Sequence, residues 1–95
     1  MPGTYKVRLL KGAQKDLESL EPALRLQVLT KLNVLETDPL PRGKSSIKIL
    51  RGFRPPLLRL RAGDFRVVFR LLQNTVEVLA VVNRKDLIRT LERLG

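Results

Sequence analysis

Arginines alternate with apolar residues over positions 57–72, and this alternation is where the chain could carry chemistry. The pattern predicts a β-hairpin around an Ala62-Gly63 turn, with one apolar face and one basic face. A guanidinium is always charged and can bind two phosphate oxygens in a fork, so a row of arginines is typical of a site for a phosphate-bearing anion. The arginines of the basic face are Arg59, Arg61, Arg66 and Arg70.

The register of this hairpin decides which arginines are available to an anion. With the predicted turn, Arg61 lies opposite Asp64, and Arg59 lies opposite Arg66. Two like charges placed directly opposite each other on neighbouring strands destabilise a sheet. We therefore expect an anion between Arg59 and Arg66, while Asp64 neutralises part of the charge on Arg61.

A third strand, expected over 75–83 after a two-residue turn, supports this assignment. Pairing outward from that turn places Arg70 opposite Glu77 and Val67 opposite Ala80, so the apolar face stays apolar. A shift of one residue would turn every side chain to the other face. Arg70 is therefore expected to be structural, through its cross-strand carboxylate.

The formal net charge is +10, and the positive charge is concentrated in the middle of the chain. The stretch up to Asp38 is nearly neutral, whereas the stretch from residue 42 to residue 70 contains one acid, Asp64. A charge run is usually a solvated face, but a one-sided cluster rich in arginine favours a polyanion, nucleic acid ahead of an acidic protein. The basic residues of that stretch are Arg42, Lys44, Lys48, Arg51, Arg54, Arg59, Arg61, Arg66 and Arg70.

The chain contains neither cysteine nor histidine. These absences exclude disulfides, a thiol nucleophile, an imidazole acid–base pair and a typical zinc site, so neither a metal nor a cofactor is expected. No apolar run approaches the length of a membrane span, and no signal-peptide pattern is present. We expect a cytoplasmic protein without a membrane partner.

Two helices are expected before the basic stretch. Helical spacing predicts the first over 12–19, and Glu21-Pro22 should end it and begin the second, because proline suits the first helical turn. The second should end before Asp38-Pro39, since proline disfavours helical geometry in the residue before it. Its apolar face carries Leu24, Val28, Leu32 and Leu35.

The remaining elements complete a single domain over residues 1–95, a length that supports one core. Period-two alternation predicts a first strand over 4–10, and Asn83 is a good N-cap for a short amphipathic helix over 83–94. The expected fold class is α+β. An N-terminal strand and an αα-hairpin would pack on a mainly antiparallel four-stranded sheet, followed by a short C-terminal helix.

This order of elements, together with three short segments, resembles the RelE/ParE superfamily of type II toxin–antitoxin toxins. Residues 58–69 are similar to the family pattern Y-R-L-R-V-G-D-Y-R-V-I-Y. Residues 82–86 resemble its G-H-R-R-E/D segment, and residues 48–52 resemble its K-x-L-x-G segment. The similarity spans nearly the whole chain in order, which is more specific than any one segment.

The resemblance implies a toxin that enters the ribosomal A site and cuts mRNA, inhibited by a cognate antitoxin. It assigns Arg66 to the scissile phosphate, Arg84 to a second catalytic position, and Arg59 to a basic position on the preceding strand. RelE proteins often use a C-terminal tyrosine as general base, and this chain has Leu87-Ile88 there.

RNA can be cleaved by attack of its own 2′-OH on the adjacent phosphate. This reaction needs a base for the hydroxyl proton, stabilisation of the phosphorane charge, and protonation of the leaving 5′-oxygen. One preorganised arginine can supply on the order of 10²–10³ in rate through the second of these. An arginine is a poor general base because its pKa lies far above neutral pH. Weak bases are available at Lys44, Lys48 and Lys85. We therefore expect the ribosome to supply the proximity that the side chains lack. The residues expected to contact RNA or the ribosome are Lys44, Lys48, Arg51, Arg54, Arg61 and Lys85.

Two other functions remain open at this point. The ParE branch of the superfamily poisons DNA gyrase, which needs no RNA chemistry. A catalytically weak basic module that binds RNA or the ribosome would favour stacking aromatics, yet Phe65 and Phe69 are expected in the core and Phe53 stands alone. In either toxin branch we expect a hetero-oligomer with the antitoxin, whose acidic segment covers the arginine face or displaces the terminal helix.

Overall fold

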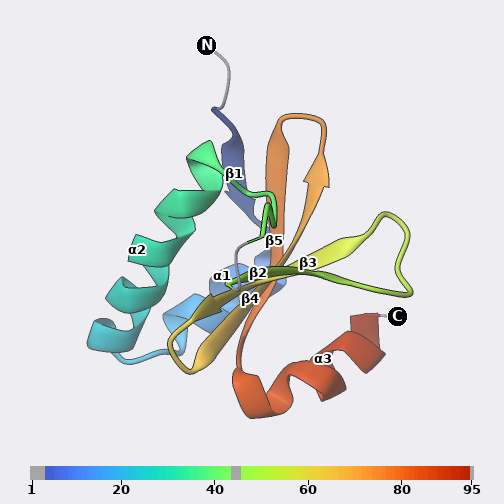
Figure 1. The fold of residues 1–95 in the computed structure, drawn as a ribbon. Helices are drawn as coiled ribbons and strands as arrows, with labels where there is room; N and C mark the ends of the chain where they lie inside the picture. Colours follow the sequence, from blue (N-terminus) through green and yellow to red (C-terminus); the bar gives the residue numbers. More distant parts are fainter. Residues whose placement is uncertain (1–3, 44–45, 95) are drawn as a thin grey trace.

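The computed structural model describes residues 4–43 and 46–94. Its elements combine a five-stranded sheet, in the order β1-β5-β4-β3-β2, with three α-helices and one 3₁₀ helix (Figure 1). In chain order they are β1 (Lys6–Leu9), α1 (Lys11–Glu18), α2 (Pro22–Thr37), β2 (Ile47–Leu50), β3 (Leu57–Ala62), β4 (Phe65–Leu72), β5 (Thr75–Asn83), η1 (Arg84–Asp86) and α3 (Leu87–Leu94).

The α+β class is confirmed, but the sheet has one strand more than expected. The N-terminal strand β1 joins the sheet by pairing in parallel with β5, so that Val7 lies opposite Val76. All other neighbouring strands are antiparallel. A parallel partner far along the chain leaves no turn signal next to β1, which is why local pattern did not reveal this pairing.

The expected αα-hairpin is present, and its boundaries follow the prolines. Pro22 occupies the first turn of α2, and α2 ends at Thr37, before Asp38 and Pro39. The α1 C-terminus is capped from α2 by the guanidinium of Arg25. This group donates hydrogen bonds to the carbonyl oxygens of Leu17 (3.0 Å), Glu18 (3.2 Å) and Leu20 (2.9 Å).

Hydrophobic clusters lie on both faces of the sheet. The larger one lies under the αα-hairpin and is built from α1, α2 and the inward residues of the strands, including Val28, Leu60 and Phe69. A smaller cluster on the opposite face contains Val68 and Ala80. We call this second face the α3 face, because Leu87 and Leu91 of α3 pack against that cluster. In Figure 1, α3 lies across the sheet from α2.

The β3–β4 hairpin has the predicted faces but a different turn. The loop is Gly63-Asp64, not Ala62-Gly63, because Ala62 is fully buried in the ladder and pairs with Phe65. Gly63 supplies the left-handed backbone conformation of the turn, with φ of 61°. The pairing is displaced by two residues, so alternation is preserved. The predicted apolar face is confirmed at Leu58, Leu60, Phe65, Val67, Phe69 and Leu71.

This displacement corrects the predicted arginine pairs. Arg61 lies opposite Arg66, not opposite Asp64, and Arg59 lies opposite Val68, not opposite Arg66. The two arginines that face each other directly are therefore Arg61 and Arg66. The predicted opposition of Arg59 and Arg66 is therefore wrong, although Arg66 does lie opposite an arginine of β3.

The β4–β5 pairing starts in the predicted register and then shifts. Arg70 lies opposite Glu77 as expected, but an irregularity between Val68 and Phe69 places Val68 opposite Ala80. The predicted pairing of Val67 with Ala80 is therefore wrong by one residue. Leu79 is the additional residue of this β-bulge. Because β5 is apolar on both sides of it, alternation alone could not locate the bulge.

Candidate functional site

Three arginines gather on the α3 face of the sheet, near the β3–β4 turn. Arg59 and Arg61 come from β3, and Arg66 comes from β4, directly opposite Arg61 and diagonal to Arg59. Directly opposed residues of an antiparallel pair have Cβ atoms about 4.5–5.5 Å apart, and diagonal ones remain within reach of long side chains. We call Arg59, Arg61 and Arg66 the arginine cluster.

No carboxylate in the described part of the chain forms an ion pair with Arg61 or Arg66. The ion pairs of residues 4–43 and 46–94 are Arg8–Glu77, Arg70–Glu77, Arg42–Asp38 and Arg89–Asp86. Asp64, the expected partner of Arg61, is in none of them. The guanidinium of Arg66 instead donates to the carbonyl oxygens of Gly63 (2.9 Å) and Phe65 (3.0 Å), which orients it along the hairpin backbone.

Arg59 is a half-buried member of the cluster. Burial lowers the pKa of Arg59, and the positive charges of Arg66 and Arg61 lower that pKa further. Its Nη1 donates to the carbonyl oxygen of Ser46 at 3.2 Å. Burial is the larger cause and repulsion by the neighbouring guanidinium groups adds to it, so a bound anion would stabilise the charged form of Arg59.

Arg84 reaches the same end of the sheet from β5. Its backbone N–H donates to the carbonyl oxygen of Asp64 at 2.8 Å, which ties the start of η1 to the β3–β4 turn. Arg66 lies opposite Val82, two residues before Arg84. Asn83 is an N-cap as predicted, since its side chain accepts from the backbone N–H of Lys85 at 3.1 Å. The helix that it caps is the 3₁₀ helix η1, and the predicted helix over 83–94 is therefore divided into η1 and α3. The structure thus brings Arg84 to the turn that carries Arg66.

The other predicted contact residues divide into two groups. Lys48 lies on β2 directly opposite Arg59, and Lys85 follows Arg84 in η1, so both border the arginine cluster. Arg51 and Arg54 are exposed in the segment between β2 and β3, at the end of β3 away from the Gly63 turn. They do not belong to the cluster. Lys44 lies outside the described residues.

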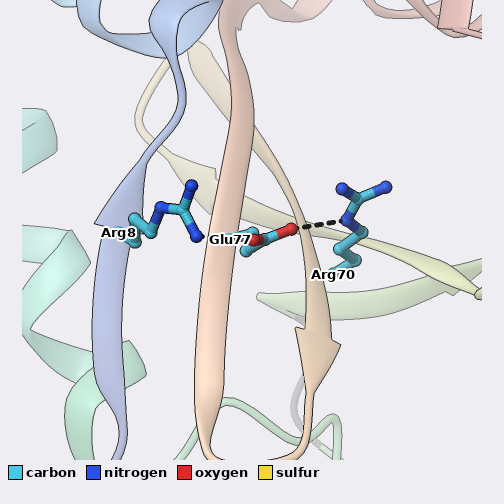
Figure 2. A network of polar contacts seen from close by, with 3 residues as sticks. All are labelled: Arg8, Arg70 and Glu77. Carbon is cyan, nitrogen blue, oxygen red and sulfur yellow. Dashed lines mark hydrogen bonds and ion pairs between the residues drawn. The ribbon is translucent and has the colours of Figure 1, made fainter.

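Arg70 belongs to a separate network that the sequence revealed only in part. The buried Glu77 carboxylate accepts from Arg70 Nε at 2.8 Å, as predicted, and also from Arg8 Nη1 at 3.2 Å (Figure 2). Arg8 was missed because the parallel register that places it opposite Glu77 could not be read from the sequence. The ion pair with Glu77 neutralises the charge of Arg70, so the predicted structural role of Arg70 is confirmed.

Among the described residues, no phenol lies at the arginine cluster. Tyr5, the only tyrosine of the chain, packs against the large cluster under the αα-hairpin. At the position of the usual RelE tyrosine, Leu87 packs on the α3 face and Ile88 is 73% exposed. Within the described ranges, no three His, Cys, Asp or Glu residues are arranged to hold a metal ion.

No helix in the described segments is both long and apolar enough to cross a bilayer.

Comparison with known proteins gives a consistent result. The family model described as ParE toxin of type II toxin-antitoxin system, parDE, matches residues 7–88. The RelE–RelB complex of Pyrococcus horikoshii contains a chain 32% identical to this one, covering 85% of this chain and 96% of that chain, with a TM-score of 0.71. A chain of the RelBE2 toxin-antitoxin complex from Mycobacterium tuberculosis is 28% identical to this one. The match covers 90% of this chain and 98% of that chain, with a TM-score of 0.74.

Among sequence relatives, RelE1 of Methanocaldococcus jannaschii is 29% identical over 83 residues, covering 86% of this chain and 91% of that protein. Sheet order, helix order and the matched residues define a toxin of the type II toxin–antitoxin class. The chain belongs to the RelE/ParE superfamily, and its structure is RelE-like.

Proposed function

We propose that this toxin is a ribosome-dependent endoribonuclease that cleaves mRNA in the A site and so inhibits translation in the cytoplasm. The observation that carries the proposal is the direct opposition of Arg61 and Arg66 without an ion pair to a described carboxylate. A cluster of this kind is stabilised by a ligand with delocalised negative charge, and a phosphodiester fits the forked guanidinium. Similarity to RelE proteins supports RNA as the source of that phosphate.

The arginines would divide the chemical work by position. Arg66 and Arg59 would bind the non-bridging oxygens of the scissile phosphate and stabilise the phosphorane charge, with Arg61 adding to the same field. Arg84 lies beside the β3–β4 turn and would stabilise charge at the leaving 5′-oxygen. A single preorganised donor of this kind is worth about 10²–10³ in rate.

Dependence on the ribosome follows from what the site lacks. The chain has no histidine, and its one tyrosine packs on the opposite face of the sheet. Lys48 and Lys85 are the remaining candidate bases among the described residues of this region, and neither carries an imidazole or a phenol. The alignment of the 2′-OH with its phosphate would then have to come from the ribosome, because holding reactants in line can supply several kcal/mol of the barrier.

Further basic residues would bind the ribosome or the RNA backbone without taking part in the chemistry. Lys48, Lys85, Arg51 and Arg54 lie around or beyond the cluster, and we extend this role to Lys44. Each phosphate contact of this kind makes binding weaker as salt rises, through release of counterions.

The partner that would inhibit the toxin is a cognate antitoxin. The solved RelE-like chains from Pyrococcus horikoshii and Mycobacterium tuberculosis come from complexes with antitoxins. For this chain we propose a hetero-oligomer in which an acidic antitoxin segment covers the arginine cluster or displaces α3. Complementary charge of this kind raises the association rate and makes it sensitive to salt.

A second candidate is inhibition of DNA gyrase, favoured by the ParE description of the matching family model. Two assays separate the candidates. Mapping of mRNA 5′ ends after induction of the toxin should show new ends within translated codons. A supercoiling assay with purified gyrase should show no inhibition. If no new ends appeared and supercoiling were blocked, the protein would be a gyrase inhibitor. If neither effect were seen, the protein would be a basic binding module.

A further inference from the structure

Strand β5 extends beyond the strand that borders it on one side. The pairing of β1 with β5 ends at Leu9 and Val78, and the Leu10 N–H donates to the Val78 carbonyl oxygen at 2.9 Å. The chain then leaves the sheet and enters α1. From Leu79 to Asn83, the edge of β5 on that side has no neighbouring strand among the described residues.

Helix α1 takes the place of the missing strand at this edge. Gly12 lies so close to β5 that a Cβ atom at this position would be 3.2 Å from the carbonyl oxygen of Leu79. One helical turn further, the Asp16 carboxylate accepts a hydrogen bond from the Val81 N–H at 2.9 Å (Oδ2 to N). Positions i and i+4 of a helix share a face, and strand residues two apart direct their backbone groups to the same edge. The spacing on α1 therefore matches the spacing on β5.

The segment held by Asp16 is the one that follows the β-bulge. Phe69 lies opposite Val78 and Val68 lies opposite Ala80, so every later pair is displaced by one residue from a regular ladder. The displaced register places Arg66 opposite Val82 and lets the Arg84 N–H reach the Asp64 carbonyl oxygen. Without the bulge, Val81 would lie opposite Arg66. Arg84 would then move by about one strand residue, roughly 3.3 Å.

We propose that Asp16 is a positioning residue for Arg84. Its carboxylate holds the Val81 N–H and so fixes the bulged end of β5 in the register that brings Arg84 to the β3–β4 turn beside Arg66. Asp16 lies on α1 and bonds to β5, whereas the arginine cluster lies on β3 and β4. The expected effect of Asp16 on cleavage rests on the proposed ribonuclease function, whereas its effect on the position of Arg84 does not.

The experiment compares three variants of the full chain. Asp16→Ala removes the acceptor for the Val81 N–H. Asp16→Asn keeps an acceptor oxygen of the same reach. Arg25→Ala is the matched control, because it removes hydrogen bonds that also hold α1, and these bonds go to the carbonyl oxygens of Leu17, Glu18 and Leu20 instead of to β5. Each is measured by thermal unfolding, by amide hydrogen exchange, and by the kcat and KM of cleavage of ribosome-bound mRNA.

Asp16→Ala should speed exchange at the Val81 and Arg84 amides, and it should lower kcat about tenfold to a hundredfold with KM nearly unchanged. A misplacement of a functional group by about 1 Å can have an effect of this size. Asp16→Asn should restore slow exchange and most of kcat. Arg25→Ala should lower the melting temperature while leaving kcat and the exchange of both amides close to wild type.

Two results would overturn the proposal. One is unchanged exchange at Val81 and Arg84 in Asp16→Ala. The other is an equal loss of kcat in Asp16→Ala and in Arg25→Ala at matched loss of stability, which would mean that Asp16 acts through stability alone. Failure of the proposed ribonuclease function would look different: the wild-type chain would not cleave mRNA, and the exchange data would still decide whether Asp16 positions Arg84.

Discussion

Arg61 on β3 lies directly opposite Arg66 on β4, and neither guanidinium forms an ion pair with a described carboxylate. Opposed like charges destabilise a sheet by some tenths of a kcal/mol. Burial lowers the pKa of the neighbouring Arg59, and the positive charges of Arg66 and Arg61 lower it further. The fold thus maintains an arrangement that an anion would stabilise, a common trade of stability for function.

A double-mutant cycle should measure this conflict. Arg61→Gln and Arg66→Gln, singly and together, should show a repulsive coupling of about 0.3–1 kcal/mol in the free energy of urea unfolding at low salt. The coupling should shrink in high salt, because exposed charges are screened. The control cycle pairs Arg66→Gln with Arg51→Gln, at the far end of β3. A coupling near zero, or one that salt does not change, would contradict direct repulsion.

Removal of either catalytic candidate should abolish toxicity without unfolding the protein. Arg66→Ala and Arg84→Ala should each lower kcat by about 10²–10³, since each removes a preorganised donor. Unfolding free energies should stay within about 0.5 kcal/mol of wild type, as is usual for accessible side chains. Arg89→Ala, an exposed arginine on α3 paired with Asp86, is the charge-matched control and should remain toxic. Toxic variants at positions 66 and 84 would show that these arginines are not catalytic.

The buried Glu77 should matter for stability and not for chemistry. Glu77→Gln should lower the unfolding free energy by about 1–2 kcal/mol, because two guanidinium groups lose the carboxylate that they pair with. The loss is no larger because water screens the charges of both arginines. Arg70→Gln should be more destabilising than Arg8→Gln, since the side chain of Arg70 is 31% exposed and that of Arg8 is 66% exposed. Urea unfolding of the three variants tests this order, and the reverse order would exclude Arg70 as the main partner of Glu77.

Sequence pattern predicted the faces of the hairpin because alternation survives a displacement by two residues. It misplaced the turn because both Ala62-Gly63 and Gly63-Asp64 contain a glycine able to adopt positive φ. The choice is made by tertiary packing, which buries Ala62 under the αα-hairpin. Because the turn is Gly63-Asp64, Arg61 and not Arg59 lies opposite Arg66.

Two further features could not be predicted, because they depend on residues far apart in the chain. The parallel pairing of Arg8 with Glu77 joins positions at opposite ends of the sequence, without a connecting turn. The bulge at Leu79 lies in a strand whose apolar residues suit either face, and the Asp16 carboxylate that accepts from Val81 beyond the bulge comes from α1. By contrast, caps and boundaries set by Pro22, Pro39 and Asn83 are local, and the sequence placed them correctly.

Anions should stabilise the folded protein through Arg59. A base whose pKa is lowered on folding penalises the folded state below that pKa, and the penalty disappears only as pH rises through it, far into the alkaline range. Near neutral pH, the Arg59 contribution should therefore not vary with pH, but bound phosphate should reduce the penalty. Thermal melts in phosphate should exceed those in chloride at matched ionic strength. Arg59→Gln should reduce this difference, and an equal difference in that variant would place the anion elsewhere.

The missing base should make cleavage responsive to an external one. Free RNA should be cut very slowly by the purified toxin, because neither imidazole nor phenol lies at the arginine cluster. Added imidazole should raise the rate in proportion to its neutral form, since it can accept the 2′-OH proton that no side chain accepts efficiently. Arg66→Ala should lose this response, which separates rescue in the site from background cleavage by the buffer. Rapid cutting of free RNA without imidazole would show that the chain already holds a competent base, and Lys48, directly opposite Arg59, would be the first residue to replace.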